Sequence, residues 1–133
     1  MCSSDLVTNA DGSAQFDRPM LEALGMQQVE TTTPWHPGTV RFEGVSLARL
    51  MQVVGAEGDR VSVVALNDYS SEIPMEDFAR YGTILALKRD GAYMPVRDKG
   101  PLFVIYPYDS TPELKHQKFY ARSVWQVAKI IVR

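Results

Sequence analysis

Short apolar runs with period two recur along the chain and predict strands joined by turns. Residues 60–66 (RVSVVAL) predict a strand, and residues 124–132 (VWQVAKIIV) alternate with period two and predict a closing strand. Residues 102–106 (LFVIY) are apolar on both faces, which is typical of a central strand, and Pro107 ends the run because proline cannot donate to a ladder. Weaker runs predict further strands over residues 26–33, 39–44, 83–87 and 93–96.

One stretch near the middle of the chain has helical spacing instead. Its apolar positions at i, i+3, i+4 and i+7 form one core-facing stripe, which consists of Leu47, Leu50, Met51 and Val54. Ser46 precedes the stripe as an N-cap, and Gly55 follows it as the expected stop. We assign this helix a structural role.

Shorter signals complete the predicted fold. Brief helices are expected over residues 18–24 and 74–81, and Asp90-Gly91 predicts a tight hairpin turn. Strands and helices follow no regular βαβ rhythm, which predicts an α+β fold with a mixed β-sheet and short helices. We divide the chain into an N-terminal arm or edge strand, residues 1–15, and one folded domain, residues 16–133.

The composition argues against nucleic acids and membranes as partners. The chain has 133 residues, a formal net charge of -2 and a pI near 5.6, so it offers no basic field to nucleic acid or to an anionic membrane. No apolar run approaches the ~20 residues of a spanning helix, so we do not expect the protein to cross a membrane.

The chain has few cysteine and histidine residues that could act in catalysis or bind a metal ion. Cys2 is the only cysteine, which excludes an internal disulfide and a zinc cluster. Its place near the first residue leaves open a processed lipoprotein terminus, with a lipid anchor, or a cloning scar. His36 and His116 have no metal-ligating residue at i+3 or i+4.

Candidate binding residues follow the strand at 60–66. Asp68, Tyr69, Ser70 and Glu72 place carboxylates, a hydroxyl and a phenol together, and Asp68 or Glu72 could accept the paired N–H donors of an amino-pyrimidine edge. Equally, Asp68 and Ser70 could satisfy backbone groups of a turn.

Aromatic residues supply a second set of candidates. Trp35 lies in the proline-rich loop PWHPG, where it could stack on a ring ligand or close the core. The polar connection over residues 106–123 also crowds rings and hydrogen-bonding groups at one rim of the predicted sheet, which is typical of a site for a flat, polar ligand.

Four segments in order, WHPGTVRFEGVSLARLM, DYSSEIPMEDF, LALKRDGAYMPVRDKGPLFVIYP and SVWQVAKIIV, resemble the molybdopterin-binding domain of the sulfite-oxidase family. The resemblance covers residues 35–132. It implies a mixed α+β fold whose strand-end loops hold a pterin. It is closest to the small, stand-alone, exported members of the family, which bind a pterin and act as sensing partners.

Three departures from the enzymes of that family change the expected ligand. The segment QQVETTTPW lacks the cysteine that ligates molybdenum, Phe103 stands where the enzymes have an arginine, and Val124 stands where they have a lysine. The resemblance with these departures implies a reduced, non-phosphorylated pterin without molybdenum.

The expected ligand-binding residues are Trp35, Asp68, Tyr69, Ser70, Glu72, Tyr120, Arg122, Ser123 and Trp125. Trp125 and Tyr120 would stack on the ring, while Arg122 and Ser123 would donate to a ring carbonyl. As alternatives, Trp125 could serve only in packing, and Arg122 could pair with Asp109 or Glu113.

The expected function is that of a non-catalytic, periplasmic pterin-binding protein that acts as the ligand-sensing partner of a membrane signalling protein. Two alternatives stay open. One is a molybdenum-cofactor-dependent oxidoreductase subunit of the sulfite-oxidase family, and the other is a ligand-free interaction module on the same fold.

Overall fold

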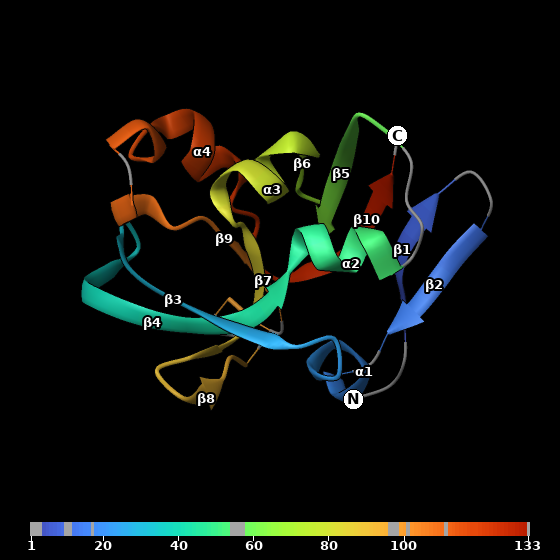
Figure 1. Cartoon of the computed structure of the whole chain (residues 1–133), viewed down its shortest axis with the longest axis horizontal. Helices are drawn as coiled ribbons and strands as arrows, with labels where there is room; N and C mark the ends of the chain where they lie inside the picture. Colours follow the sequence, from blue (N-terminus) through green and yellow to red (C-terminus); the bar gives the residue numbers. More distant parts are fainter. Residues whose placement is uncertain are drawn as a thin grey trace.

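The computed structural model describes residues 4–9, 12–16, 18–53, 58–95, 99–100, 102–110 and 112–132. It contains two five-stranded sheets with short helices around them (Figure 1). The α+β class predicted from the sequence is confirmed, but the strands form two sheets rather than one. Cys2 and Gly55 lie outside the described residues.

The first sheet has the order β2-β1-β10-β5-β6. Its strands are β1 (Ser4–Asn9), β2 (Gly12–Phe16), β5 (Arg60–Ala65), β6 (Ser70–Pro74) and β10 (Val127–Val132). β10 is parallel to β1 and antiparallel to β5. The strand expected to close the sheet therefore lies at its centre, because the N-terminal hairpin of β1 and β2 adds to its other side.

The second sheet has the order β3-β4-β7-β8, and β9 pairs with β7. Its strands are β3 (Met26–Thr33), β4 (His36–Ser46), β7 (Ile84–Arg89), β8 (Ala92–Tyr93) and β9 (Phe103–Ile105). β7 and β8 form the predicted hairpin, with positive φ angles of 52° at Asp90 and 87° at Gly91.

The helices are α1 (Arg18–Glu22), α2 (Leu47–Val53), α3 (Glu76–Tyr81) and α4 (Gln117–Arg122), with 3-10 turns η2 (Tyr108–Ser110) and η3 (Pro112–Leu114). Ser46 caps α2 as predicted, because its Oγ accepts from the Arg49 amide at 3.3 Å. Gly82, at φ 71°, ends α3. α4 interrupts a connection that the sequence predicted as a loop; its six residues are too few for a periodic signal.

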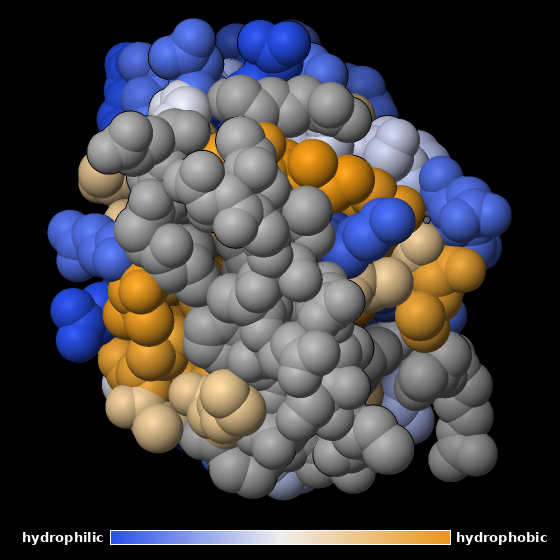
Figure 2. Space-filling view, turned by 90° about the vertical axis from the view of Figure 1, so that its right-hand side faces the viewer, coloured by the Kyte–Doolittle hydropathy of each residue, from blue (hydrophilic) through white to orange (hydrophobic). Residues whose placement is uncertain are grey.

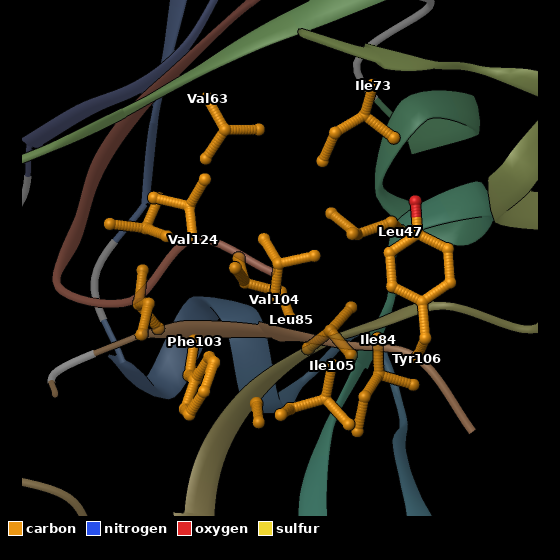
Figure 3. Close-up of a cluster of buried hydrophobic side chains, with 14 of the residues drawn as sticks. Leu47, Val63, Ile73, Ile84, Leu85, Phe103, Val104, Ile105, Tyr106 and Val124 are labelled. Atoms are coloured by element: carbon orange, nitrogen blue, oxygen red, sulfur yellow. The ribbon is translucent and has the colours of Figure 1, made fainter. Parts of the chain in front are cut away.

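One apolar core joins the two sheets. Figure 3 shows Val63 and Ile73 of the first sheet on one side of the core and Ile84 and Leu85 of the second sheet on the other, with Val104 of β9 pointing into the space beside Leu85. All three residues of β9 are buried, which confirms the prediction that both of its faces are covered. β9 is not central in a ladder, because it pairs with β7 and, among the residues that the structure describes, its other bridge is an isolated one from Phe103 to Trp125.

The two ends of the molecule differ. The side with β1 and β2, at the right of Figure 1, faces the viewer in Figure 2; among its described residues, hydrophilic ones gather along the upper rim. The turn between β3 and β4 lies at the opposite end, on the same side as α4 (Figure 1). The pocket described next is built at that end.

Candidate functional site

A pocket of about 390 Å³ opens where the two sheets and α4 meet, a size typical of small-molecule sites. It is formed by the end of β5, the turns after β3 and β5, α4 and the segment that leads into β10. The lining residues are Pro34, Trp35, Ala65, Asn67, Tyr69, Gln117, Tyr120, Ala121, Ser123, Val124 and Trp125. None of these described lining residues carries a charge.

Trp35 is the centre of the aromatic wall. Its ring centroid lies 5.6 Å from that of Trp125 and 5.9 Å from that of Tyr120, both in edge-to-face orientation. On the core side, Trp35 contacts Phe103 at 5.5 Å and Tyr108 at 6.1 Å. Trp35 is therefore both a core residue and part of the pocket, so the two readings of this residue left open by the sequence are not exclusive.

Trp125 and Tyr69 are the more accessible aromatic residues, with 36% and 50% of their surface exposed. The Tyr69 hydroxyl donates to the Ala121 carbonyl at 3.2 Å and so ties the β5–β6 turn to α4. Asn67 Oδ1 accepts from the Tyr69 amide at 3.1 Å and fixes the turn. An ammonium group stands at the edge of this wall, because Lys99 Nζ lies 5.1 Å from the ring centroid of Trp125.

The structure brings five of the predicted binding residues into the pocket lining: Trp35, Tyr69, Tyr120, Ser123 and Trp125. Asp68, Ser70, Glu72 and Arg122 do not line it. Asp68 occupies a left-handed turn position at φ 70°, and Ser70 begins β6. Glu72 is directed to an exposed ion pair with Arg60 at 3.2 Å.

Arg122 pairs with a residue that the sequence did not indicate. Its guanidinium donates to Asp77 Oδ2 at 2.7 Å, and the Tyr106 hydroxyl donates to the same oxygen at 2.8 Å. The alternative that Arg122 pairs with a carboxylate holds, but its partner is Asp77 rather than Asp109 or Glu113, because α3 brings Asp77 to the end of α4. Burial, reinforced by the Asp77 carboxylate, raises the pKa of Tyr106 well above its ordinary value, so this phenol stays a donor.

Ser123 lies in the pocket wall but its hydroxyl is already used. The residue is 2% exposed, and its Oγ donates to the Phe119 carbonyl at 3.0 Å and shares a hydrogen bond with the Tyr108 hydroxyl. Burial raises the pKa of Tyr108, which keeps that phenol protonated. Ser123 therefore links α4 to Tyr108 and has a structural role in the pocket wall.

Six lining residues were not among the sequence candidates: Pro34, Ala65, Asn67, Gln117, Ala121 and Val124. Most are small or apolar and carry no chemical signal. Asn67 belonged to the polar cluster after residues 60–66, and its place directly at the strand end was the one signal available. Gln117 lies on α4, which was not predicted.

Asp109 fastens the strand that leads to Trp35. Its two carboxylate oxygens accept from the amide and hydroxyl of Thr32 at 2.8 and 2.6 Å, and Lys115 Nζ lies 3.1 Å from Oδ1. The hydrogen bonds from Thr32, with a smaller contribution from Lys115, lower the pKa of Asp109.

This lowered pKa predicts an acid-dependent effect of Asp109→Asn. A carboxyl whose pKa is depressed on folding stabilises the protein above its unfolded pKa of about 4 and loses that effect as the pH falls through the folded pKa. The variant should therefore be less stable than the parent near neutral pH, and urea titrations should show the difference shrinking as the pH falls below about 4. A pH-independent difference would contradict the assignment.

No group of three or more His, Cys, Asp or Glu side chains suited to a metal ion occurs in the described part of the chain. Within the same residues, no helix is long and apolar enough to span a membrane.

Comparison with known proteins identifies the family. A comparison with curated proteins found no match. The sequence model of one family, described as the oxidoreductase molybdopterin binding domain, matches residues 18–110, which is more than half of the chain. The matched part includes the strands of the second sheet and the pocket residues up to Tyr69, whereas α4 and Trp125 follow it. The chain therefore belongs to the oxidoreductase molybdopterin-binding domain family.

Proposed function

We propose that this protein binds the fused ring of a reduced, non-phosphorylated pterin and performs no redox chemistry with it. The observation that carries the proposal is the uncharged pocket of about 390 Å³, with four aromatic residues in its lining, in a molybdopterin-binding domain. Each aromatic contact to a flat ring contributes about 1 kcal/mol beyond the area that it buries.

The chemistry of the lining suits the ring better than the complete molybdenum cofactor. The cofactor carries a phosphate and a metal, and a buried anion needs cationic or N–H partners. No described lining residue is a cation or a thiolate, and the single cysteine of the chain is at position 2. The side chains of Asn67, Gln117 and Tyr120 instead offer neutral donors and acceptors for a ring edge.

In this arrangement the selectivity comes from neutral groups. Neither Asp68 nor Glu72, the carboxylates that the sequence offered as a paired acceptor, belongs to the lining. The Gln117 amide offers an acceptor and a donor there, and the Asn67 amide, whose Oδ1 already accepts from Tyr69, offers its NH2 group as a donor. A buried ring donor or acceptor left unmatched would cost about 1–3 kcal/mol, which favours a pterin over an apolar ring of the same size.

Anaerobic calorimetry with tetrahydrobiopterin tests the proposal. Parent protein should bind the reduced pterin, and Trp125→Ala should weaken binding at least about tenfold, whereas Glu72→Gln should leave it unchanged because Glu72 lies outside the lining. A mass spectrum of small molecules released from protein purified without oxygen should contain a pterin. Absence of binding by the parent protein would overturn the proposal.

A second candidate is a molybdenum-dependent oxidoreductase subunit, and the family match is the observation that favours it. Metal analysis separates the two functions. Protein expressed in a host that makes the cofactor should contain no molybdenum at near-equal molar ratio under our proposal; a stoichiometric amount would establish the alternative.

We extend the proposal to the setting in which the protein works. Its resemblance to small exported pterin-binding members supports a periplasmic location and a membrane-bound signalling partner that reads pterin occupancy. Capture of a membrane protein from its source cells by the pterin-loaded protein, and not by the pterin-free protein, tests this part. Equal capture in both states would contradict it and would favour a ligand-independent interaction module.

A further inference from the structure

A buried ion pair lies directly behind the α4 side of the pocket. Arg122 and Asp77 have 19% and 7% of their side chains exposed, and no other ion pair among the described residues that the structure shows is comparably buried. Two further residues contact the pair. The Tyr106 hydroxyl donates to Asp77, and the centroid of the Phe119 ring lies 5.3 Å from the Arg122 guanidinium carbon.

The pair joins α3 to the end of α4, within the stretch of chain that lines the pocket. Arg122 is the last residue of α4, and Asp77 lies in the first turn of α3. Gln117, Tyr120 and Ala121 precede Arg122 in the pocket lining, and Ser123 to Trp125 follow it, yet Arg122 itself is not part of the lining. The Arg122 side chain therefore pairs with Asp77 outside the pocket, while its neighbours in sequence line the pocket.

Backbone hydrogen bonds transmit the position of Arg122 to that wall. The Arg122 carbonyl accepts from the Val124 amide at 3.0 Å, and the Val124 carbonyl accepts from the Val104 amide of β9 at 2.9 Å. The Ser123 amide donates to the Tyr120 carbonyl at 3.1 Å. A shift of Arg122 would therefore move the residues on which Trp125 is mounted.

We propose that Asp77 and Arg122 are positioning residues for the pocket: they hold the end of α4, and through it Trp125, without touching the ligand. The proposal rests on the pocket being the ligand site assigned above. Loss of either charge would leave the other buried without its counterion, so the helix end must move to hydrate it. Affinity falls because the wall moves, and no ligand contact is lost.

Hydrogen exchange of the ligand-free protein tests the positioning role without any ligand. Asp77→Asn and Arg122→Ala should each increase exchange at the Ser123 and Val124 amides at least about tenfold, and Arg122→Lys should restore most of the protection. Arg60→Ala, which removes the exposed pair with Glu72, is the matched control and should leave these amides unchanged. Unchanged protection in both Asp77→Asn and Arg122→Ala would overturn the proposal.

Affinity for tetrahydrobiopterin separates positioning from direct contact. If Arg122 positions the wall, Asp77→Asn and Arg122→Ala should weaken binding similarly, about tenfold. If Arg122 bound the ligand directly, Asp77→Asn would free its guanidinium and would maintain or tighten binding, and this result would overturn the proposal. A parent protein that binds no pterin would refute the proposed function alone, since the exchange experiment would still decide the role of the pair.

Discussion

Replacing Trp35 with alanine is expected to weaken pterin binding more than any other single change in the pocket, and to destabilise the fold at the same time. Its ring contacts Trp125 and Tyr120 on the pocket side and Phe103 and Tyr108 on the core side. Removing a core tryptophan costs about 3–5 kcal/mol, and Trp35 is only partly buried, so we expect a loss of about 3 kcal/mol. Affinity should fall well beyond tenfold, because the rings of Trp125 and Tyr120 lose the surface against which they pack.

Urea denaturation and calorimetry measure the two effects separately. Trp35→Phe keeps an aromatic ring at the site and should recover a large part of both stability and affinity. Val53→Ala, at a residue that is 45% exposed and outside the pocket lining, controls for loss of an apolar side chain and should change neither quantity appreciably. Affinity of Trp35→Ala equal to that of the parent protein would show that the pocket is not the ligand site.

A large effect on stability alone is expected for Gly44→Ala. A Cβ atom at this position would lie 2.2 Å from the Leu85 carbonyl oxygen and 2.6 Å from the Ala86 Cα. Both are backbone atoms of β7, so the clash can be relieved only by separating β4 from β7, where Gly44 pairs with Ala86 next to a register shift. We expect a loss of about 3 kcal/mol or more, at the upper end of the costs of overpacking.

Gly82→Ala provides the matched comparison. Gly82 also has no side chain and ends α3 at φ 71°, but no atom lies within 4 Å of the position of its Cβ. Its substitution should cost only the left-handed backbone strain, about 1–2 kcal/mol. Urea midpoints of the two variants measure the contrast. Gly44 has no positive φ, so a loss for Gly44→Ala no larger than that for Gly82→Ala would contradict the close approach of β4 and β7 as the reason for glycine at position 44.

Local signals were sufficient for most of the individual elements. The strand predicted over residues 60–66, the β-branched content of residues 26–33 and the Asp90-Gly91 turn each correspond to an element of the structure. These signals act over a few residues, so the chain itself carries them. The helix α4 in the long polar connection before β10 was not predicted, because it depends on contacts with α3, such as the pair of Arg122 with Asp77, that lie far away in the sequence.

The candidate binding residues also differ in how well the sequence predicted their positions. Aromatic residues near strand ends were recognisable as pocket candidates from their type, and Trp35, Tyr69, Tyr120 and Trp125 do share one pocket. The charged candidates could not be placed in the same way, because the orientation of a charged side chain depends on which oppositely charged residue the fold brings near it. Glu72 faces Arg60 across a β-hairpin, and Arg122 faces Asp77 of another helix.

By itself, the sequence determined the α+β class, the family and the aromatic character of the site, since these depend on residue type and on short spacings. Only the tertiary structure decided the division into two sheets, the central place of β10 and the lack of charge in the pocket lining. The physical reason is that strand order and ion pairing are settled between segments distant in sequence, where the free energy of burying a surface or a charge depends on everything that packs around it.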